Sequence, residues 1–402
     1  MCGDSKLSKR TIRDIEVDGK NVLVRVDFNI PLDIRTGAIS DDTRLRAVLP
    51  TVRYLIDHKA RVILCSHLGR PDGKVVDSLR MAPVALRFSQ LIGRPVITTT
   101  DCVGSEAREA VSALENGEIL LLENLRFHPE EVRNDPSFAR SLAQLANIYV
   151  DDAFGTAHRA HASTVGVAEY LPSVAGFLME KELRALGSIM DNPATPFCAL
   201  LGGAKVSDKI ALIQNILDKV NLICVGGGMA ATFLHAQGYG VGYSSVEGDK
   251  LDLARQLVES TKRKGVSFHL PVDVMVADSI DDNAQTDIVS VAEIEHTKYI
   301  VDIGPQTIKD FCQQLKQCQT VFWNGPLGIC EIPRFARGTK SIADFVAGIE
   351  ATTVIGGGST AETVAEMGLS DKMTHVSTGG GAGLMFLEGK TLPGVAVLLE
   401  EA

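Results

Sequence analysis

The sequence predicts an α/β protein made of two doubly wound, Rossmann-like parallel-sheet domains. Short runs rich in β-branched residues alternate with amphipathic stretches along the whole chain. Most of these runs are nearly all apolar, which is typical of strands buried on both faces of a parallel sheet. The chain has 402 residues, which is long for one hydrophobic core. The alternation and the length together favour two domains.

The expected strands of the first half span residues 21–27, 61–67, 95–99, 118–124 and 147–153. Those of the second half span 197–202, 221–226, 266–270, 320–324, 352–356 and 374–378. Helices are expected between them, among others at 42–58, 83–92, 207–217, 249–264 and 337–348. Each helix candidate carries an apolar stripe at helical spacing, which suits packing on a sheet.

The domain boundary is expected between Tyr170 and Pro196. Leu171-Pro172 and the segment 191–196, which holds two prolines, bracket a stretch at 176–190 with a helical pattern. We therefore expect a first domain at 1–175, an interdomain helix at 176–195 that acts as a hinge, and a second domain from 196.

Charge and composition exclude several classes of partner. The net charge is −10, so the chain as a whole repels nucleic acid and anionic membranes. It has one Trp, which disfavours stacking of bases on aromatic platforms. No apolar run approaches the roughly 20 residues of a membrane span, and no signal peptide is seen. Eight scattered cysteines without a C-x-x-C pair are expected to be reduced thiols in a cytoplasmic protein.

Basic side chains follow the expected strand ends of the first half, where α/β sheets bind ligands. They are Arg44, His67, Arg70, Arg126 and Arg159. The planar guanidinium binds phosphate or carboxylate through two hydrogen bonds, so the set predicts an anion site, with Asp27 and Asn29 suited to a substrate hydroxyl. The alternative is that these arginines pair with carboxylates such as Asp41, Asp42 and Asp152. The alternatives for His158 and His161 are a metal site, a part of the anion site, or a packing role, and Arg159 between them disfavours a cation.

Glycine-rich turns follow strands of the second half, at 202–203, 226–228, 356–358 and 379–381. Glycines let backbone N–H groups approach a phosphate, and the N-terminus of a following helix adds positive potential. Neither the P-loop pattern nor the dinucleotide G-x-G-x-x-G fingerprint is present. Lys205 is expected to meet a transferring phosphoryl group, Lys209 either adds charge or faces solvent, and Glu331 suits ribose hydroxyls.

In order along the chain, these blocks resemble the phosphoglycerate kinase family. The similarity rests on RVDFNIP, SHLGRP, ENLRF, DDAFGTAHRAHAS, GGAKVSDK, NGPLG and STGGGA, and it covers essentially the whole chain. It implies two domains that face a cleft, the first binding phosphoglycerate and the second, at 196–391, binding the nucleotide. It also implies a tail at 392–402 that packs back on the first domain, and a monomer. The implied reaction moves a phosphoryl group reversibly from 1,3-bisphosphoglycerate to Mg-ADP, giving 3-phosphoglycerate and ATP.

The resemblance also implies roles for individual residues. Residues that hold the phosphoglycerate would be Asp27, Phe28, Asn29, Arg44, His67, Leu68, Gly69, Arg70, Arg126 and Arg159. Residues that hold the nucleotide would be Lys205, Lys209, Gly226, Gly227, Asn324, Glu331, Gly357, Gly358, Ser359 and Thr360. The phosphoryl group in transfer would meet Arg44, Lys205, Gly356, Gly379 and Gly380. The only cofactor implied is Mg²⁺, carried by ADP or ATP.

Ser359 departs from the family pattern, in which an aspartate at this position helps to hold Mg²⁺. Ser359-Thr360-Ala361-Glu362 is a capping-box pattern, so the serine either caps a helix or contacts the metal directly or through water. The substitution raises the alternative of a catalytically weakened binding protein with the same fold. A nicotinamide-dependent dehydrogenase is a further alternative, although the missing fingerprint and the basic residues weigh against it.

Overall fold

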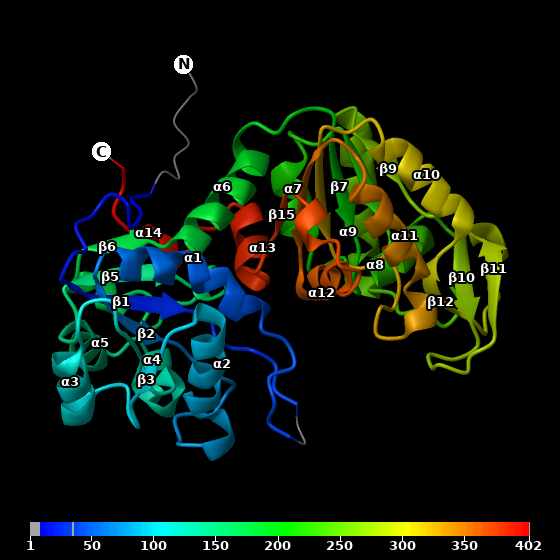
Figure 1. Ribbon diagram of the computed structural model, residues 1–402. Helices are drawn as coiled ribbons and strands as arrows, with labels where there is room; N and C mark the ends of the chain where they lie inside the picture. Colours follow the sequence, from blue (N-terminus) through cyan, green and yellow to red (C-terminus); the bar gives the residue numbers. More distant parts are fainter. Residues whose placement is uncertain (1–8, 34–35, 402) are drawn as a thin grey trace. The chain divides into compact units, whose positions relative to one another are not determined.

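The computed structural model describes residues 9–33 and 36–401 of the chain. The chain divides into two compact units (Figure 1). The first unit comprises Met1–Arg184 and Thr391–Ala402, and the second comprises Ala185–Lys390. Among the described residues, no helix combines the length and the apolar character that a membrane crossing requires.

A six-stranded parallel sheet forms the centre of the first unit, in the order β3-β4-β2-β1-β5-β6. Its strands are β1 (Asn21–Val26), β2 (Arg61–Cys65), β3 (Ile97–Thr98), β4 (Ile119–Leu121), β5 (Ile148–Asp152) and β6 (Ser173–Ala175). Its helices are α1 (Thr43–Asp57), α2 (Ala82–Ile92), α3 (Gly104–Ala113), α4 (Pro129–Val132), α5 (Pro136–Ala143) and α14 (Pro393–Ala396). Short 3₁₀ helices are η1 (Asp77–Leu79), η2 (Leu125–Phe127), η3 (Phe154–Thr156) and η4 (Gly166–Glu169).

Both faces of this sheet are buried, as the apolar strand sequences predict. Val22 and Val24 of β1 pack in one core with residues of α1 and α2 such as Leu45. Leu23, between them, packs in a second core with residues of α3 and α5 such as Val111. Because successive side chains of a strand point to opposite faces, a run without polar residues forms two cores at once.

A second six-stranded parallel sheet forms the centre of the second unit, in the order β15-β14-β13-β7-β8-β9. Its strands are β7 (Phe197–Leu201), β8 (Leu222–Val225), β9 (Ser267–His269), β13 (Thr320–Asn324), β14 (Thr352–Gly356) and β15 (His375–Val376). Its helices are α7 (Ile210–Ile216), α8 (Gly227–Ala236), α9 (Leu251–Arg263), α10 (Pro305–Leu315), α11 (Arg337–Val346), α12 (Gly358–Glu366) and α13 (Gly381–Leu387). Short 3₁₀ helices are η5 (Gly248–Lys250), η6 (Val291–Glu293), η7 (Pro333–Phe335) and η8 (Ser370–Lys372). The expected two-sheet α/β fold is therefore confirmed.

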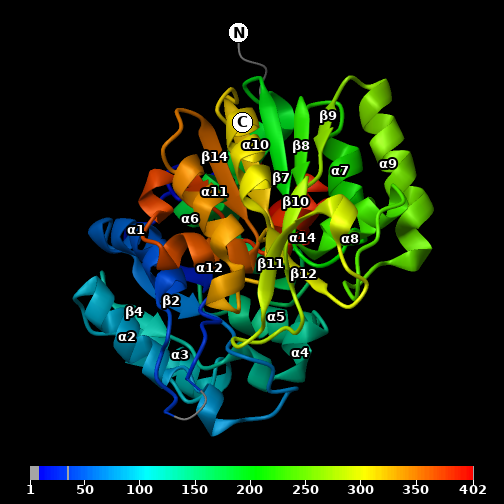
Figure 2. The same cartoon turned by 90° about the vertical axis from the view of Figure 1, so that its right-hand side faces the viewer.

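The sequence prediction missed a three-stranded antiparallel sheet in the second unit. It consists of β10 (Asp273–Ala277), β11 (Thr286–Ser290) and β12 (Tyr299–Ile303), in the order β11-β10-β12, and its strands lie side by side in Figure 2. Ile288 of β11 is 47% exposed, whereas Val274 of β10 is fully buried. Strand β11 carries polar residues and so lacks the continuous apolar run by which the other strands were recognised, whereas the apolar run 274–277 of β10 was overlooked.

Helix α6 (Phe177–Asp191) lies where a helix was expected, at 176–190, and the division between the two units falls within it. Asp152, at the end of β5, accepts the backbone N–H groups of Leu178 and Met179 at 2.8 and 3.2 Å. A carboxylate from a strand thus pairs two of the first-turn amides of this helix.

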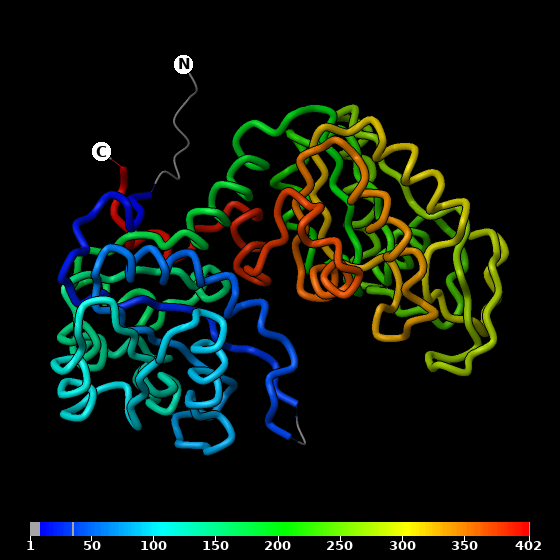
Figure 3. Tube along the Cα trace, viewed as in Figure 1, coloured from blue at the N-terminus to red at the C-terminus, as the bar shows by residue number. Residues whose placement is uncertain are grey.

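The C-terminal tail hydrogen-bonds to the first unit, to which it belongs (Figure 3). Arg10 donates its backbone N–H to Leu399 O at 2.9 Å, and Leu399 donates to Ser173 O at 2.9 Å. Gly394 of α14 donates to Ala157 O, also at 2.9 Å. The last residues of the chain therefore complete the packing of its first unit.

Candidate active site

In each parallel sheet there is a point from which successive connections along the chain run in opposite directions. Several of the predicted site residues follow the strands at this point. In the first unit β1 lies between β2 and β5, and Asp27, His67 and Arg159 lie at or beyond the carboxyl ends of these strands. In the second unit β7 and β13 are neighbours, and Lys205 and Asn324 follow or end them. Open α/β sheets bind ligands at such switch points, so in each unit this is the edge of the sheet at which a ligand is expected.

Several cations gather at the switch point of the first unit. Burial, together with the positive charges of Arg159, Arg25 and Arg70, lowers the pKa of Arg126 to about 10. Arg126 donates from Nη1 to Gly69 O at 2.8 Å, and its buried Nε has no protein partner among the described residues. Cations that repel one another at close range are stabilised by an anion, so this cluster is suited to bind one.

Arg44 is the member of the predicted set with a protein carboxylate partner. Its Nη1 donates to Asp27 Oδ2 and to Asn29 O, each at 2.9 Å, and its side chain is 37% exposed. Asp42 instead holds Arg46 and Arg87. Arg44 therefore does pair with a carboxylate, as the alternative to an anion site has it, but its partner is Asp27 and not one of the carboxylates named there. Both residues that orient Arg44 were themselves predicted to bind substrate.

Asn29, Gly69 and Arg126 form a connected polar chain. Gly69 donates its N–H to Asn29 Oδ1 at 2.9 Å, and its carbonyl accepts from Arg126. Asn124 supports the same loop, because its side-chain oxygen accepts the Leu68 N–H and its amide nitrogen donates to Leu68 O. The loop after β2 is thus held at both sides by side chains from other strand ends.

The remaining predicted residues of the first unit range from fully buried to exposed. Phe28 is fully buried and Leu68 is 2% exposed, so their side chains belong to the core, and any contact with a ligand there is limited to the backbone. Arg70 is exposed, and Arg159 is partly buried, with its Nε 3.3 Å from His158 Nε2. His67 is 2% exposed, and burial holds its pKa well below the ordinary value, helped by the charges of Arg25 and Arg126.

In the second unit, the glycine triplet at 356–358 opens a helix whose N-terminal amides are unpaired within the helix. Gly357 has φ +88° and is the N-cap of α12. The first helical hydrogen bond runs from Ala361 N–H to Gly357 O at 3.0 Å. The N–H groups of Gly358, Ser359 and Thr360 precede that bond and belong to the free first turn, which is where a helix binds an anion.

In the glycine triplet at 379–381, one backbone N–H group already has a partner within the protein. Gly379 donates its N–H to Ser377 Oγ at 3.1 Å, so this amide is already engaged. Gly380, with φ +49°, is the N-cap of α13, and the first hydrogen bond of the turn runs from Ala382 N–H to Gly379 O. The amides of Gly380 and Gly381 precede it, so of the two predicted glycines only Gly380 keeps an available donor.

Two glycines predicted to bind nucleotide use their amides inside the fold. Gly226 donates to Leu201 O at 2.9 Å and Gly227 donates to Leu327 O at 3.0 Å. A Cβ on Gly227 would lie 2.6 Å from Pro326 O, so the turns after β7, β8 and β13 are in close contact. These N–H groups are not available to a phosphate, and the lack of a side chain at Gly227 is explained by packing.

Lys209 is buried rather than solvated. It is 9% exposed and donates from Nζ to Asn324 Oδ1, and burial lowers its pKa. The solvent-facing alternative for this lysine is therefore wrong. Lys205, by contrast, is exposed, as is Glu331, so both remain free to contact a ligand from the surface.

Ser359 does not cap a helix, so the capping-box interpretation is wrong. The N-cap is Gly357, without a side-chain hydrogen bond, and Ser359 is an exposed residue of the first turn. Thr360 is fully buried, and its hydroxyl accepts the N–H of Gly325 at 3.0 Å. Thr360 thus holds the turn after β13, while the Ser359 hydroxyl remains accessible.

With this geometry, the chain compares closely with proteins of one family. The protein-family model for phosphoglycerate kinase matches residues 12–390. The curated phosphoglycerate kinase of Pelotomaculum thermopropionicum is 53% identical over 395 residues, covering 98% of this chain and 100% of that protein. The curated phosphoglycerate kinase of Synechococcus elongatus is 54% identical over 403 residues, with the same coverage. The solved structure of phosphoglycerate kinase from Coxiella burnetii matches with a TM-score of 0.86 at 41% identity, covering 97% of this chain and 98% of that one.

The chain belongs to the phosphoglycerate kinase family. It is therefore a phosphotransferase that acts in glycolysis, and the dehydrogenase alternative is wrong. The sequence resemblance is confirmed over nearly the whole chain, and no similarity favours the catalytically weakened alternative.

For a phosphoglycerate kinase, the structure adds Arg25 as a site neighbour that the sequence analysis did not select, and it defines the surroundings of His161, which was a candidate there. Arg25 is 1% exposed and its Nη2 lies 3.1 Å from His67 Nδ1. His161 is partly buried, and burial together with the charge of Arg126 lowers its pKa to about 4. Arg25 sits in the RVDFNIP block, two residues before Asp27, and a buried charge in an apolar strand is the signal that would have found it.

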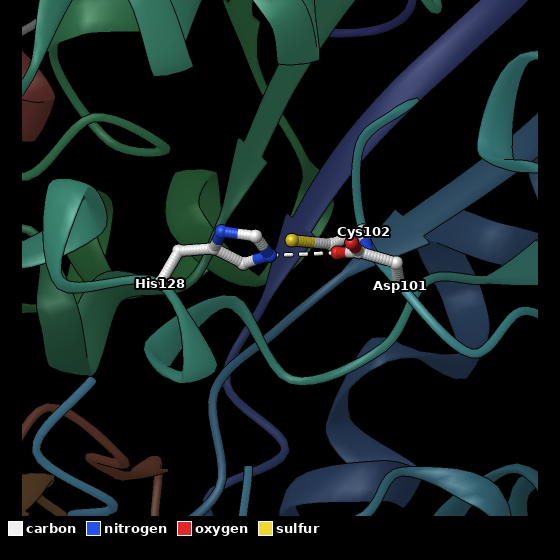
Figure 4. Close-up of side chains that lie close together, drawn as sticks. All are labelled: Asp101, Cys102 and His128. Atoms are coloured by element: carbon white, nitrogen blue, oxygen red, sulfur yellow. Dashed lines mark hydrogen bonds and ion pairs between the residues drawn. The ribbon is translucent and has the colours of Figure 1, made fainter. Parts of the chain in front are cut away.

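A group of possible metal ligands lies elsewhere in the first unit of this kinase. Asp101, Cys102 and His128 have ligand atoms within 4.8 Å of one another (Figure 4). Asp101 Oδ1 and His128 Nε2 are already hydrogen-bonded at 2.6 Å. Two donors at about 2.0–2.1 Å from a tetrahedral zinc ion lie roughly 3.3 Å apart, so this pair would have to separate to share an ion. The hydrogen bond accounts for the arrangement, and no metal role is assigned to it.

Proposed function

We propose that the first unit of this kinase binds 3-phosphoglycerate and 1,3-bisphosphoglycerate, and that the second unit binds Mg-ADP and Mg-ATP. The observation that carries this assignment is the cation cluster at the switch point of the first unit. Arg126 and Arg159 each have their pKa lowered by burial and by other arginines, and Arg70 beside them is exposed. An anionic substrate would relieve that repulsion.

In the first unit, Arg70, Arg126 and Arg159 would hold the phosphate of the phosphoglycerate as guanidinium donors. Asn29 and His67 would contact the remaining oxygens, while Asp27 orients Arg44 through its 2.9 Å ion pair. Arg44 would then meet the phosphoryl group in transfer.

In the second unit, the first-turn amides of α12 would bind nucleotide phosphates, and Glu331 would accept hydrogen bonds from ribose hydroxyls. Mg²⁺ arrives with the nucleotide as a part of the substrate. The exposed Ser359 hydroxyl would contact it directly or through a water molecule, since Mg²⁺ usually keeps several waters.

Catalysis would rest on positioning and charge neutralisation, because phosphoryl transfer needs little covalent help from the protein. Arg44, Lys205 and the Gly380 amide would carry the neutralisation. We also expect a cytoplasmic monomer, for which sedimentation in solution would give the mass of a single chain.

Calorimetric titrations with 3-phosphoglycerate and with Mg-ADP, each alone, test the assignment. Arg126→Gln should weaken 3-phosphoglycerate binding by about tenfold or more and leave Mg-ADP binding unchanged, because a charge-assisted hydrogen bond is worth about 1.5–3 kcal/mol. Lys205→Ala should do the reverse. Arg108→Gln, an exposed arginine of α3, is the control and should change neither. Unchanged 3-phosphoglycerate binding in Arg126→Gln would overturn the assignment.

A further inference from the structure

Arg25 is a buried cation without a carboxylate partner among the described residues. It is 1% exposed, at the end of β1, and its Nε donates to Ser163 Oγ at 2.9 Å. Its Nη1 donates to Val26 O, and its Nη2 lies 3.1 Å from His67 Nδ1. Burying a guanidinium is costly unless its donors are satisfied, so these contacts determine where it lies.

The contact with Arg25 determines the protonation state of His67. A guanidinium can only donate, so His67 Nδ1 must accept, and that nitrogen carries no proton. Burial and the charges of Arg25 and Arg126 lower the pKa of His67 well below its ordinary value, so the ring is neutral. The proton of a neutral ring whose Nδ1 accepts must be on Nε2. His67 is thus a neutral residue with one N–H donor.

On the other side of Arg25, Ser163 connects it to Glu131, which is fully buried. The Ser163 hydroxyl donates to Glu131 Oε1 at 2.6 Å, and the Ser163 N–H donates to Glu131 Oε2 at 2.9 Å. Because the hydroxyl proton points to the carboxylate, the lone pairs of the same oxygen face Arg25. Every donor direction in the chain Glu131–Ser163–Arg25–His67 is therefore fixed.

Glu131 also supplies negative charge to the cation cluster. Its charge raises the pKa of Arg126, against the effects of burial and of the neighbouring arginines. His161 Nδ1 lies 3.7 Å from Glu131 Oε1. The Glu131 carboxylate is fully buried, so it balances the cations without being exposed to solvent.

We propose that Glu131 is a positioning residue of this kinase, which acts through Ser163 and Arg25 to hold His67 in its Nε2–H form. The proposal rests on the assignment of phosphoglycerate to the first unit. Its consequence is that Glu131 in α4 and Ser163, which need not touch substrate, control how tightly substrate binds. A buried hydrogen-bond chain of this kind keeps side chains in one geometry before the substrate arrives.

The test combines a tautomer measurement with a binding measurement. Nitrogen-15 NMR of histidine-labelled full-length protein reports which ring nitrogen of His67 is protonated, and calorimetry reports the affinity for 3-phosphoglycerate. Ser163→Ala removes the connecting hydroxyl and leaves both charges in place. Ser173→Ala is the matched control, because it removes another buried first-unit hydroxyl, bonded to Leu171 O at 2.8 Å, that is not in the chain.

In Ser163→Ala we expect His67 to populate both tautomers and 3-phosphoglycerate affinity to fall about tenfold, with Mg-ADP affinity unchanged. Ser173→Ala should keep the wild-type tautomer and affinity. A single Nε2–H tautomer with unchanged affinity in Ser163→Ala would overturn the proposal.

If wild type itself did not bind 3-phosphoglycerate, the site assignment would fail, while the tautomer comparison would still decide whether the hydrogen-bond chain through Ser163 and Arg25 holds His67. Glu131→Gln is a second variant with the same expected direction, and Ser163→Ala decides alone if Glu131→Gln does not fold.

Discussion

Gly69 donates its backbone N–H to the side-chain oxygen of Asn29 over 2.9 Å. The bond joins the loop after β2 to the loop after β1, and the Gly69 carbonyl accepts from Arg126. Gly69 has φ +64°, and a Cβ there would lie 2.8 Å from the Leu79 side chain. The backbone conformation favours glycine at this point of the site, and the Leu79 side chain would have to shift to admit a Cβ.

Gly69→Ala should therefore lower 3-phosphoglycerate affinity and reduce the free energy of unfolding by roughly 1–3 kcal/mol. Gly93→Ala is the matched control, since Gly93 has φ +76° with nothing within 4 Å of its would-be Cβ. It should cost only the backbone strain, about 1–2 kcal/mol, and leave affinity intact. Chemical denaturation and calorimetry measure both effects, and equal substrate affinity in the two variants would contradict the account.

Arg44→Ala should lower kcat by about 10²–10³, as expected for loss of a group that neutralises charge in the transition state. Arg46→Ala, two residues along α1, removes a side chain that pairs with Asp42 instead and should leave kcat within about twofold. Mg-ADP affinity should hold in both. Steady-state kinetics in the direction of ATP formation decide, and an unchanged kcat in Arg44→Ala would remove Arg44 from the mechanism.

Ser359→Asp should shift the Mg²⁺ dependence of activity to lower concentration, because a carboxylate binds Mg²⁺ more strongly than a hydroxyl does. The position is exposed and in the first turn of α12, where a negative charge is also favourable to the helix. The measurement is initial rate against free Mg²⁺ at fixed nucleotide. Superimposable curves would mean that this position does not govern metal use.

His161 should make the first unit sensitive to acid. Burial, with Arg126, Arg25 and Arg159, lowers its pKa from 6.5 to about 4, so the folded protein binds the proton less well than the unfolded chain does. Stability is therefore complete above about pH 6.5 and falls as the pH approaches 4. His161→Gln should reduce that loss by on the order of 1–2 kcal/mol, after allowance for partial exposure. Thermal melts at pH 7 and pH 5 measure this loss of stability. His58→Gln, at an exposed residue of the same unit, is the control. Equal acid sensitivity in the two variants would contradict the role given to His161.

Much of the fold could be predicted from the sequence because most of its strands are buried in parallel sheets. The expected ranges 320–324 and 352–356 coincide with β13 and β14. Strand β6 (Ser173–Ala175) was missed because it directly follows Leu171-Pro172, which was interpreted as the edge of the domain boundary. In the antiparallel sheet, the exposed positions of β11 interrupt the apolar pattern, whereas the apolar run 274–277 of β10 was overlooked.

The sequence predicted the part of the candidate site that depends on which residues follow the ends of the strands. Arg44 and Arg126 follow strand ends, and strand ends meet at one edge of a parallel sheet. The sequence did not predict which side chains already hydrogen-bond within the protein, because these bonds join segments that are distant in sequence. Lys209 donates to Asn324 and Arg25 donates to Ser163, each across more than 100 residues of sequence.

The most direct test of the central claim is steady-state ATP formation from 1,3-bisphosphoglycerate and ADP by the full-length protein, with and without Mg²⁺. We expect Mg²⁺-dependent ATP formation by wild type and a loss of about 10²-fold or more in kcat/KM for 1,3-bisphosphoglycerate when Arg126 is replaced by Gln, with Arg108→Gln unaffected. ATP formation by Arg126→Gln at the wild-type rate, or no ATP formation by wild type, would contradict the account.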